Sequence, residues 1–525
     1  MLPPRSVYSV SDLRSDSVPD NTLLQQSIAA HENFIDGIDE RLVEMERKME
    51  ELRSLRKAAS TELEIHRGLL SPIRRLFPEI LEKVFEYAVE ESNRIAPAAA
   101  PQVFTAVCHK WRTIALETRH LWRRVRIDEE FFETNHAHRW LSQWLSHSGT
   151  LPLNIAIDID KEALDVVEKA ELLGELCSSA VQTILYNPNR QVEKFTWFGD
   201  CLVFNPMLMK IPTVGCPTLH SLTISMSRTF PLEDRDWAHI GRFLEFPQLR
   251  SLELWGCGFL FPCFRLSSKL QRLTVKGNVI PHLVSPYATW ISMWKTCPNL
   301  VDVEIDLECV ALRGHVEPMD LLESNHLRRL KIHRRLSSED RGFFVLGNLL
   351  APKLRTLEVH RASRGYTVEE ALYEALYKLI SRASSALRCL SLLGLDITAG
   401  KAKDLLRLAP EVRKIQIASS AFITALHPPP NATPDEWICP KLTSIGFQGD
   451  LGSRADIVEL ILRRATASPR DPPGSHYLTA IEGHGKFIHL LIRVPQLREL
   501  NLREQNATGE FTYLKSYHVT SHEVC

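Results

Sequence analysis

The stretch CPTLHSLTIS, residues 216–225, recurs along the second half of the chain with mainly its polar positions changed. Its core is an apolar residue, two variable residues, a second apolar residue, one variable residue and a third apolar residue. This core begins at Val192, Leu219, Leu249, Leu270, Leu300, Leu327, Leu354, Leu387, Val412, Leu442 and Leu497. From Leu219 to Leu442 eight steps cover 223 residues, so the period is about 28, which is typical of stacked repeats.

Each core predicts one short strand. Its fourth and sixth positions alternate with polar residues, which is the pattern of a strand with one buried face. The residues between cores must return the chain, and residues 367–383 have the apolar spacing of a helix. One unit cannot bury its own apolar edge, whereas stacked units share a continuous core. The interval from Leu442 to Leu497 is twice the period, so we expect a further unit around YLTAIEG, residues 477–483.

This pattern resembles that of leucine-rich-repeat proteins over residues 191–510. The resemblance implies an α/β solenoid, and the fold class that we expect is therefore α/β. The chain departs from the family at the asparagine that follows the strand, which occurs in register only at Asn278. Cys257 occupies that place in the preceding copy, so we expect irregular turns and uneven curvature.

The composition is that of an ordinary globular protein, with 44% hydrophobic and 24% charged residues. The net charge is −1, so no global field favours nucleic acid or a membrane as a partner. The sequence has no secretory leader and no long apolar run, so we expect a cytoplasmic or nuclear protein with reduced thiols. Three of its eleven cysteines share one place in the repeat, which favours packing over catalysis or metal binding: Cys216, Cys297 and Cys439.

Two segments come first in the chain. Residues 1–21 are rich in Ser, Pro and Asp, and we expect them to be disordered. Residues 22–70 carry a 3-4 spacing in which eleven of fourteen seam positions are apolar, which predicts a coiled-coil helix. Self-association through residues 24–70 is one interpretation, and a long amphipathic helix folded back on its own chain is the other.

Two short apolar segments follow, beginning with LFPEILEKVF, residues 76–85. Pro78 suits the first turn of a helix, where its missing N–H is no loss. The second segment covers residues 103–122. Their apolar positions include Ile80, Leu81, Val84, Phe85, Val107, Trp111, Leu121 and Trp122. Two helical segments this short cannot bury all of their apolar side chains against each other. We therefore expect them to pack on another surface.

Residues 71–127 resemble the F-box family. The resemblance is carried by Leu76, Pro78-Glu79, Val84-Phe85, the stretch VCHKWR at residues 107–112, and Leu121-Trp122. F-box proteins dock on the adaptor of an SCF-type cullin–RING ubiquitin ligase, and leucine-rich repeats are among their usual receptor domains. The resemblance implies an adaptor protein and an unknown target protein as partners. The adaptor-binding residues that it implies, together with the apolar positions above, are Leu76, Pro78, Glu79, Ile80, Leu81, Val84, Phe85, Val107, Trp111, Leu121 and Trp122.

The outward positions of the predicted strands carry charges whose sign changes from one strand to the next. A mosaic of both signs suits a protein surface or a charged peptide. The candidate target-binding residues are Trp255, Arg272, Asp302, Glu304, Arg329 and Lys331. The alternative is that neighbouring strands neutralise one another across the sheet.

No motif of catalysis, nucleotide binding or metal binding is found in the sequence, so we expect no enzyme activity, no cofactor and no metal site. Residues 128–190 are expected to lead into the repeats, and residues 511–525 to form a tail. The alternative function is a non-catalytic repeat scaffold for protein–protein interaction, with the F-box-like segment serving only as a cap on the repeats.

Overall fold

The structure is a computed structural model of the 525-residue chain. It describes residues 3–5, 21–95, 100–128, 137–159, 177, 180, 191–199, 204, 217–226, 244–277, 286–306, 321–334, 343–361, 369–428, 436–448, 454–465, 480–483, 501–505 and 511–513. The chain divides into two compact units, Met1–Val84 and Phe85–Cys525. Most of the segment predicted to be disordered lies outside the described residues.

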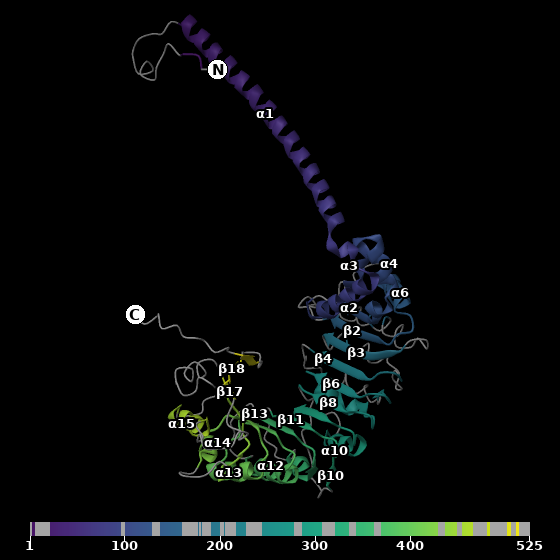
Figure 1. The fold of residues 1–525 in the computed structure, drawn as a ribbon, viewed down its shortest axis with the longest axis vertical. Coiled ribbons are helices and arrows are strands. Elements are labelled where there is room, and N and C mark those ends of the chain that lie inside the picture. Colours follow the sequence, from purple (N-terminus) through teal and green to yellow (C-terminus); the bar gives the residue numbers. More distant parts are fainter. Residues whose placement is uncertain are drawn as a thin grey trace. The chain divides into compact units, whose positions relative to one another are not determined.

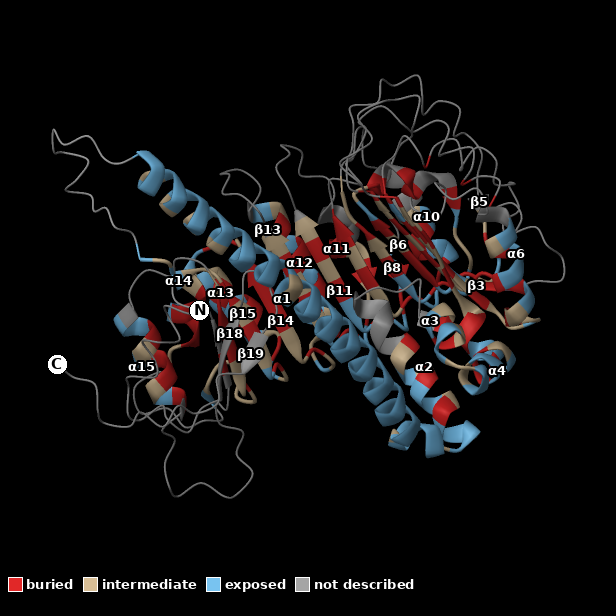
Figure 2. Cartoon of the chain, turned by 90° about the horizontal axis from the view of Figure 1, so that it is seen from above, coloured by how far each residue is buried: buried red, intermediate tan, exposed pale blue. Residues whose placement is uncertain are grey.

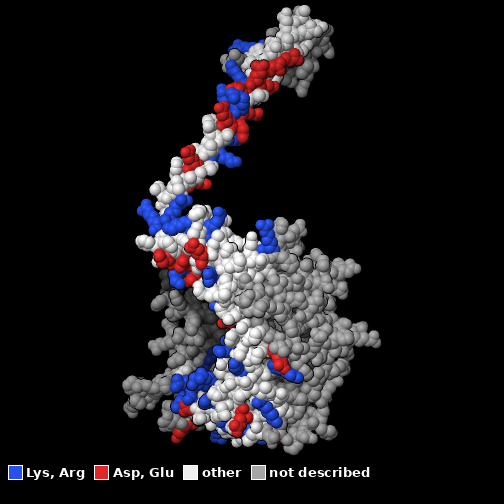
Figure 3. Space-filling model, turned by 90° about the vertical axis from the view of Figure 1, so that its right-hand side faces the viewer, with Lys and Arg blue, Asp and Glu red and all other residues white. Residues whose placement is uncertain are grey.

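The first unit consists mainly of one long helix, α1 (Asn21–Leu70), in which no residue is buried. Figure 2 shows this helix exposed along its length. Charges of both signs follow one another along it (Figure 3), and Glu44 pairs with Arg47 and Lys48 within one turn. A short turn, η2 (Pro72–Arg75), separates α1 from α2 (Pro78–Ile95), which begins at the predicted proline. The helix predicted for residues 22–70 is thus confirmed, whereas its self-association stays a prediction.

The second unit begins within α2 and continues with short helices. These are α3 (Ala100–Val107), α4 (His109–Glu117), η3 (Arg119–Arg123) and α6 (Ala137–Ser148). The indole N–H of Trp122 donates to the carbonyl oxygen of Ala115 at 2.7 Å, and that of Trp144 donates to the carbonyl oxygen of Trp122 at 2.8 Å. These bonds fix the end of the helical segment directly before the first strand.

Within the described residues, fifteen strands form one sheet in the order of the sequence. They are β1 (Arg124–Asp128), β2 (Leu153–Ile159), β3 (Val192–Gly199), β4 (Ser221–Met226), β6 (Ser251–Trp255), β8 (Arg272–Val275), β9 (Asp302–Asp306), β11 (Arg329–Arg334), β13 (Thr356–Arg361), β14 (Cys389–Leu393), β15 (Lys414–Ile417), β16 (Ser444–Phe447), β17 (Ala480–Gly483), β18 (Asn501–Gln505) and β19 (Phe511–Tyr513). All pairs are parallel except β18–β19. The strands form a curved row along this unit (Figure 1).

The repeated cores account for eleven of these strands, all except β1, β2, β17 and β19. Leu354, Leu357 and Val359 have no more than 2% of their surface exposed, and the corresponding positions of the other described cores are buried in the same way. The unit expected around residues 477–483 is confirmed as β17. The sheet also extends beyond residues 191–510, because β1 and β2 precede that range and β19 lies in the segment expected to be a tail.

Helices connect several of the strands and lie along one side of the curved row (Figure 1). They are α10 (Pro286–Thr296), α11 (Phe343–Asn348), α12 (Glu369–Ala383), α13 (Ala399–Arg407), α14 (Ser420–Leu426) and α15 (Arg454–Ala465). The helix predicted for residues 367–383 is confirmed as α12. Two small parallel pairs complete the unit, β5 (Leu244–Glu245) with β7 (Phe264–Arg265) and β10 (Leu322–Glu323) with β12 (Leu349–Leu350). In the part of the chain that the structure describes, no helix is long and apolar enough to cross a membrane.

Small residues let successive turns approach one another at the ends of the strands. Gly256 and Gly277 adopt φ angles of 71° and 115°. A Cβ atom added to Gly277 would lie 2.4 Å from the Cα atom of Gly256, closer than any side chain tolerates. At the place where the leucine-rich-repeat pattern has asparagine, the thiol of Cys257 donates to the carbonyl oxygen of Ile224 at 3.4 Å. Asn278 lies outside the described residues.

The cysteines at the shared repeat position are packing residues. Cys297 and Cys439 are buried, and their Sγ atoms face backbone carbonyl oxygens at 3.4–3.6 Å. Burial raises the pKa of both thiols to about 12. Cys216 lies outside the described residues. A thiol held neutral among carbonyl groups is a poor nucleophile, which agrees with the packing interpretation of the two described positions.

Candidate functional site

The helix α2 presents an apolar stripe to solvent. Phe77, which caps the helix through its carbonyl oxygen, is 74% exposed. Ile80, Val84 and Tyr87 follow at helical spacing and are 49%, 41% and 70% exposed. Residues three and four positions apart lie on one face of a helix, so these four side chains form a continuous strip along α2. We call Phe77, Ile80, Val84 and Tyr87 the α2 stripe.

The opposite side of α2 is buried. Leu81 and Phe85 have no exposed surface, and Val89 continues their row. Sequence reasoning assigned Leu81 and Phe85 to the adaptor, but both side chains are fully buried, which does not support that role. The helix is therefore apolar on two sides, and only one of them is used by the chain.

The predicted residues around the start of α2 are accessible to different degrees. Pro78 and Glu79 are exposed, and Leu76 is half-buried. Sequence reasoning missed Phe77 and Tyr87. The signal that could have found them is their spacing, three residues before Ile80 and three residues after Val84.

The helices α3 and α4 of the second unit also have some apolar side chains that are exposed and others that are buried. Val103 and Val107 lie one turn apart on α3 and are both more than half exposed. Trp111 is half-buried, and its ring meets that of Phe85 edge-on, with ring centroids 4.9 Å apart. Phe104 stacks on Phe85, with ring centroids 4.3 Å apart, and also meets Trp111 edge-on at 6.3 Å. Of the two residues predicted here, Val107 is free to contact a partner and Trp111 mainly supports the aromatic cluster.

The predicted residues Leu121 and Trp122 lie inside the second unit. Their side chains are 1% and 4% exposed. The ring of Trp122 packs edge-on against that of Trp144 of α6, with centroids 4.8 Å apart. Both residues join the helical segment to the beginning of the sheet, and their burial does not support the adaptor-binding role predicted for them.

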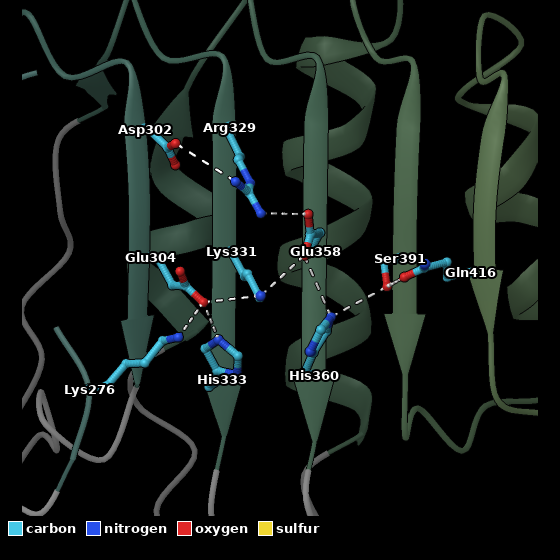
Figure 4. Close-up of polar contacts among 10 residues, drawn as sticks. All are labelled: Lys276, Asp302, Glu304, Arg329, Lys331, His333, Glu358, His360, Ser391 and Gln416. Atoms are coloured by element: carbon cyan, nitrogen blue, oxygen red, sulfur yellow. Dashed lines mark hydrogen bonds and ion pairs between the residues drawn. The ribbon is translucent and has the colours of Figure 1, made fainter. Parts of the chain in front are cut away.

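The second candidate surface is the polar face of the central strands. Parallel, in-register pairing places Asp302 beside Arg329, and Lys331 between Glu304 and Glu358. Residues directly opposite one another on a sheet are near enough to interact. The result is a ladder of charged side chains that runs across β9, β11 and β13 (Figure 4). The predicted strand alternation therefore placed these candidates correctly on one face.

Glu304 is the centre of this ladder. Its carboxylate Oε1 lies 2.8 Å from Nζ of Lys276, 3.1 Å from Nζ of Lys331 and 2.7 Å from Nε2 of His333. Burial alone would raise the pKa of this carboxyl group. Hydrogen bonds from His333 and Lys276, together with the charge of Lys331, outweigh burial and hold the pKa well below its usual range. Glu304 is therefore a paired anion whose charge is already satisfied.

The neighbouring positions are also engaged. Arg329 lies between Asp302 at 3.9 Å and Glu358 at 3.3 Å. Burial, aided by the charges of Glu304 and Glu358, raises the pKa of Asp302 despite the presence of Arg329. Burial, aided by the charges of His333 and Lys331, lowers the pKa of His360 to about 4. These contacts favour the alternative in which charged side chains of neighbouring strands neutralise one another. They do not favour a surface whose charges are free to bind a ligand.

Two predicted target-binding residues stand apart from the paired centre. Trp255 is 37% exposed, and Nζ of Lys276 lies 4.0 Å from its ring centroid. Arg272 is exposed and lies beside Asp302 in the register of β8 and β9. An exposed aromatic ring next to a cation is a common anchor for a protein partner. Among the described residues, no group of three or more His, Cys, Asp or Glu side chains could hold a metal ion.

Comparison with protein-family models finds none that matches this chain, and comparison with curated proteins finds no match either.

Proposed function

We propose that this chain is the substrate-recognition subunit of an SCF-type cullin–RING ubiquitin ligase. In this proposal the F-box-like helices dock on the ligase adaptor, and the sheet unit is a leucine-rich-repeat solenoid that binds a target protein. The observation that carries the proposal is the α2 stripe. A helix whose inner side is already buried has no reason within its own fold to expose four large apolar side chains in a row. Such strips mark helices that complete another protein's groove.

The free energy gained by burying the α2 stripe can be compared with the cost of association. Burying the exposed parts of the α2 stripe stabilises a complex by about 4–7 kcal/mol. Association costs about 4–15 kcal/mol, so the stripe alone supports at most weak binding. The exposed side chains of Val103 and Val107 on α3 supply further apolar area. We therefore propose that the adaptor contacts both helices.

Co-purification with the adaptor tests this proposal. Val84→Asp places a charge in the α2 stripe at a position that is 41% exposed, so the fold tolerates it. The matched control is Tyr377→Asp on α12, because Tyr377 is exposed to the same extent far along the sheet. We expect the wild type and Tyr377→Asp to retain the adaptor and Val84→Asp to lose it, with unchanged circular dichroism. Failure of the wild type to bind, or equal capture of all three chains, would refute the proposal.

The alternative is a non-catalytic repeat scaffold in which the F-box-like segment only caps the sheet. A specific observation favours it: Leu121 and Trp122 are buried next to β1, so the end of the segment does have a structural role. The two functions predict different results for Val103→Asp, which changes an exposed residue of α3. Loss of adaptor binding with an unchanged melting temperature supports the ligase subunit. A lowered melting temperature without any adaptor binding supports the cap.

A further inference from the structure

The helix α1 carries an apolar seam that the single chain leaves uncovered. Its heptad positions a and d run from Leu24 to Leu70, at spacings that alternate between four and three residues. No residue of α1 is buried. The large apolar residues of the seam that are exposed are Ile28, Ile35, Ile38, Leu42, Met45, Met49, Leu52, Leu63 and Leu70. The spacing holds over more than six heptads, whereas three to four already indicate a coiled coil, so the seam fits a helix of the same period.

The charges beside the seam, at heptad positions e and g, show which way the partner helix runs. In a parallel, in-register pair, residue g of one helix faces residue e of the other, five residues further along the sequence. This places Arg41 opposite Glu46, and Glu62 opposite Arg67. Each contact occurs twice when the two helices are identical. Two copies of α1 in parallel therefore form four attractive contacts between opposite charges.

The parallel arrangement also brings one pair of like charges together, Lys48 and Arg53. Both cations already have a partner on their own helix. Nζ of Lys48 lies 3.3 Å from Oε1 of Glu44, and Nη1 of Arg53 lies 3.5 Å from Oε2 of Glu50. By contrast, the four side chains that would attract one another form no ion pair within the part of the chain that the structure describes. The pairs along the helix thus offset the repulsion and leave the attractive charges available to a second copy.

An antiparallel pair with the same overlap fits these charges less well. It places Leu24 opposite Leu70, so that Glu46 faces its own copy and Lys48 faces its own copy near the centre. The attractive contact between positions e or g in this arrangement joins Asp39 and Arg53, and it also occurs twice. Two attractive contacts against two repulsive ones give no preference for this orientation. The charges therefore favour the parallel pair.

Arg56 is the polar residue at position a, and it faces its own copy in the parallel pair. Its long side chain can cover the seam with its methylene groups and place the guanidinium group in water. A two-stranded coiled coil leaves such an edge open at every position a. A single polar residue at this position fixes the register and the number of strands, at a cost in stability. Arg56 is therefore compatible with a two-stranded seam.

We propose that α1 forms a parallel, in-register, two-stranded coiled coil with a second copy of this chain. Both chains then leave the coiled coil at the same end, after Leu70, and continue into α2 and the sheet unit. The dimer does not depend on the ligase function. Its one consequence that rests on the proposed function is avidity, since two target-binding units on one dimer would hold a target with two binding segments more tightly than either unit alone.

Sedimentation equilibrium of the full chain tests the pairing of charges. We expect Arg41→Glu and Glu46→Arg each to raise the Kd of the dimer about tenfold, because two attractive contacts become repulsive. An equimolar mixture of the two variants should recover the wild-type affinity, since their charges complement each other at both contacts. Glu40→Arg is the matched control, because it reverses the same charge at an exposed position on the side of α1 away from the seam. It should leave the Kd unchanged.

Energy transfer between dyes measures the orientation independently. The dyes are coupled to a non-natural amino acid that replaces Gln26, an exposed residue on the side of α1 away from the seam. In the parallel pair the two dyes lie side by side, and we expect strong transfer. In the antiparallel pair Gln26 faces Gly68, which is about 63 Å away along the helix at 1.5 Å per residue, and transfer is weak.

Four results would overturn the proposal. They are a wild type that stays monomeric, a mass above that of a dimer, weak energy transfer, and an Arg41→Glu variant that associates as tightly as the wild type. The last result is expected of the antiparallel pair, in which Arg41 faces Leu55. Adaptor capture by Arg41→Glu should equal that of the wild type, because each copy keeps its own α2 stripe. Failure of the dimer can thus be told apart from failure of the ligase function.

Discussion

Replacing Glu304 by glutamine removes the charge on which the ladder of β9–β13 converges. The substitution keeps the shape of the side chain but leaves Lys276, Lys331 and His333 around a neutral amide. A charge-assisted hydrogen bond contributes about 1.5–3 kcal/mol, and contributions that converge on one group do not add in full. Because the side chain is only 16% exposed, solvent compensates little. We expect Glu304→Gln to lower the free energy of unfolding by about 2–4 kcal/mol.

The pH dependence of this effect has a definite sign. The folded-state pKa of Glu304 lies below its ordinary value of 4.5, so the stabilisation is fully present above pH 4.5 and is lost as the pH falls below it. Below pH 4.5 the difference in unfolding free energy between the wild type and Glu304→Gln should therefore shrink by about 1.4 kcal/mol per pH unit.

Urea unfolding followed by circular dichroism measures both effects. Glu358→Gln is the matched control, because Glu358 is also 16% exposed but its cationic neighbours Arg329 and Lys331 lie at 3.3 and 3.6 Å. We expect a clearly smaller loss of stability for Glu358→Gln. Equal losses for the two variants would refute the proposal that Glu304 is the centre of the ladder. A difference between the wild type and Glu304→Gln that grows as the pH falls below 4.5 would refute it as well.

Three further predictions concern other parts of the chain. Gly277→Ala should lower the melting temperature by several degrees, since its φ angle and the backbone of Gly256 leave no room for a Cβ atom, and a fully stable variant would contradict the stacked turns. Cys439, whose thiol pKa is raised to about 12, should resist iodoacetamide at pH 8 in the folded chain and react after unfolding in urea; rapid native labelling would contradict its packing role. The apolar seam of α1 is exposed, so the chain should self-associate above micromolar concentration, and the double variant Met45→Glu, Leu52→Glu should have the mass of a monomer in light scattering. A wild type that is monomeric at every concentration would contradict self-association through α1.

The repeated cores determine much of the second unit, and their strands could be predicted because each one carries the same three apolar positions. Leu354, Leu357 and Val359 are examples in which spacing alone predicts burial. By contrast, Pro152 occupies the leading position before β2, so a search for the repeat passes over that strand. At β1 the residues Trp122, Val125 and Ile127 do match the pattern, although the sequence analysis did not count them as a repeat.

The candidate surfaces show where sequence reasoning stops. An apolar residue of α2 can face the chain's own core or solvent, and both faces have helical spacing. Ile80 and Leu81 are neighbours in sequence, yet one is half exposed and the other is enclosed. Only the packing of Phe85 with Phe104 and Trp111 decides which side of α2 faces inward.

Titration calorimetry between the full chain and the ligase adaptor at several temperatures tests the central claim most directly. If the α2 stripe is a docking surface, the adaptor gives measurable binding heat with a negative heat-capacity change, the mark of apolar burial. Ile80→Asp should then weaken binding by at least thirtyfold, about 2 kcal/mol. Absence of binding heat at 100 µM adaptor, or an affinity that Ile80→Asp leaves unchanged, would contradict the claim that this stripe exists for another protein.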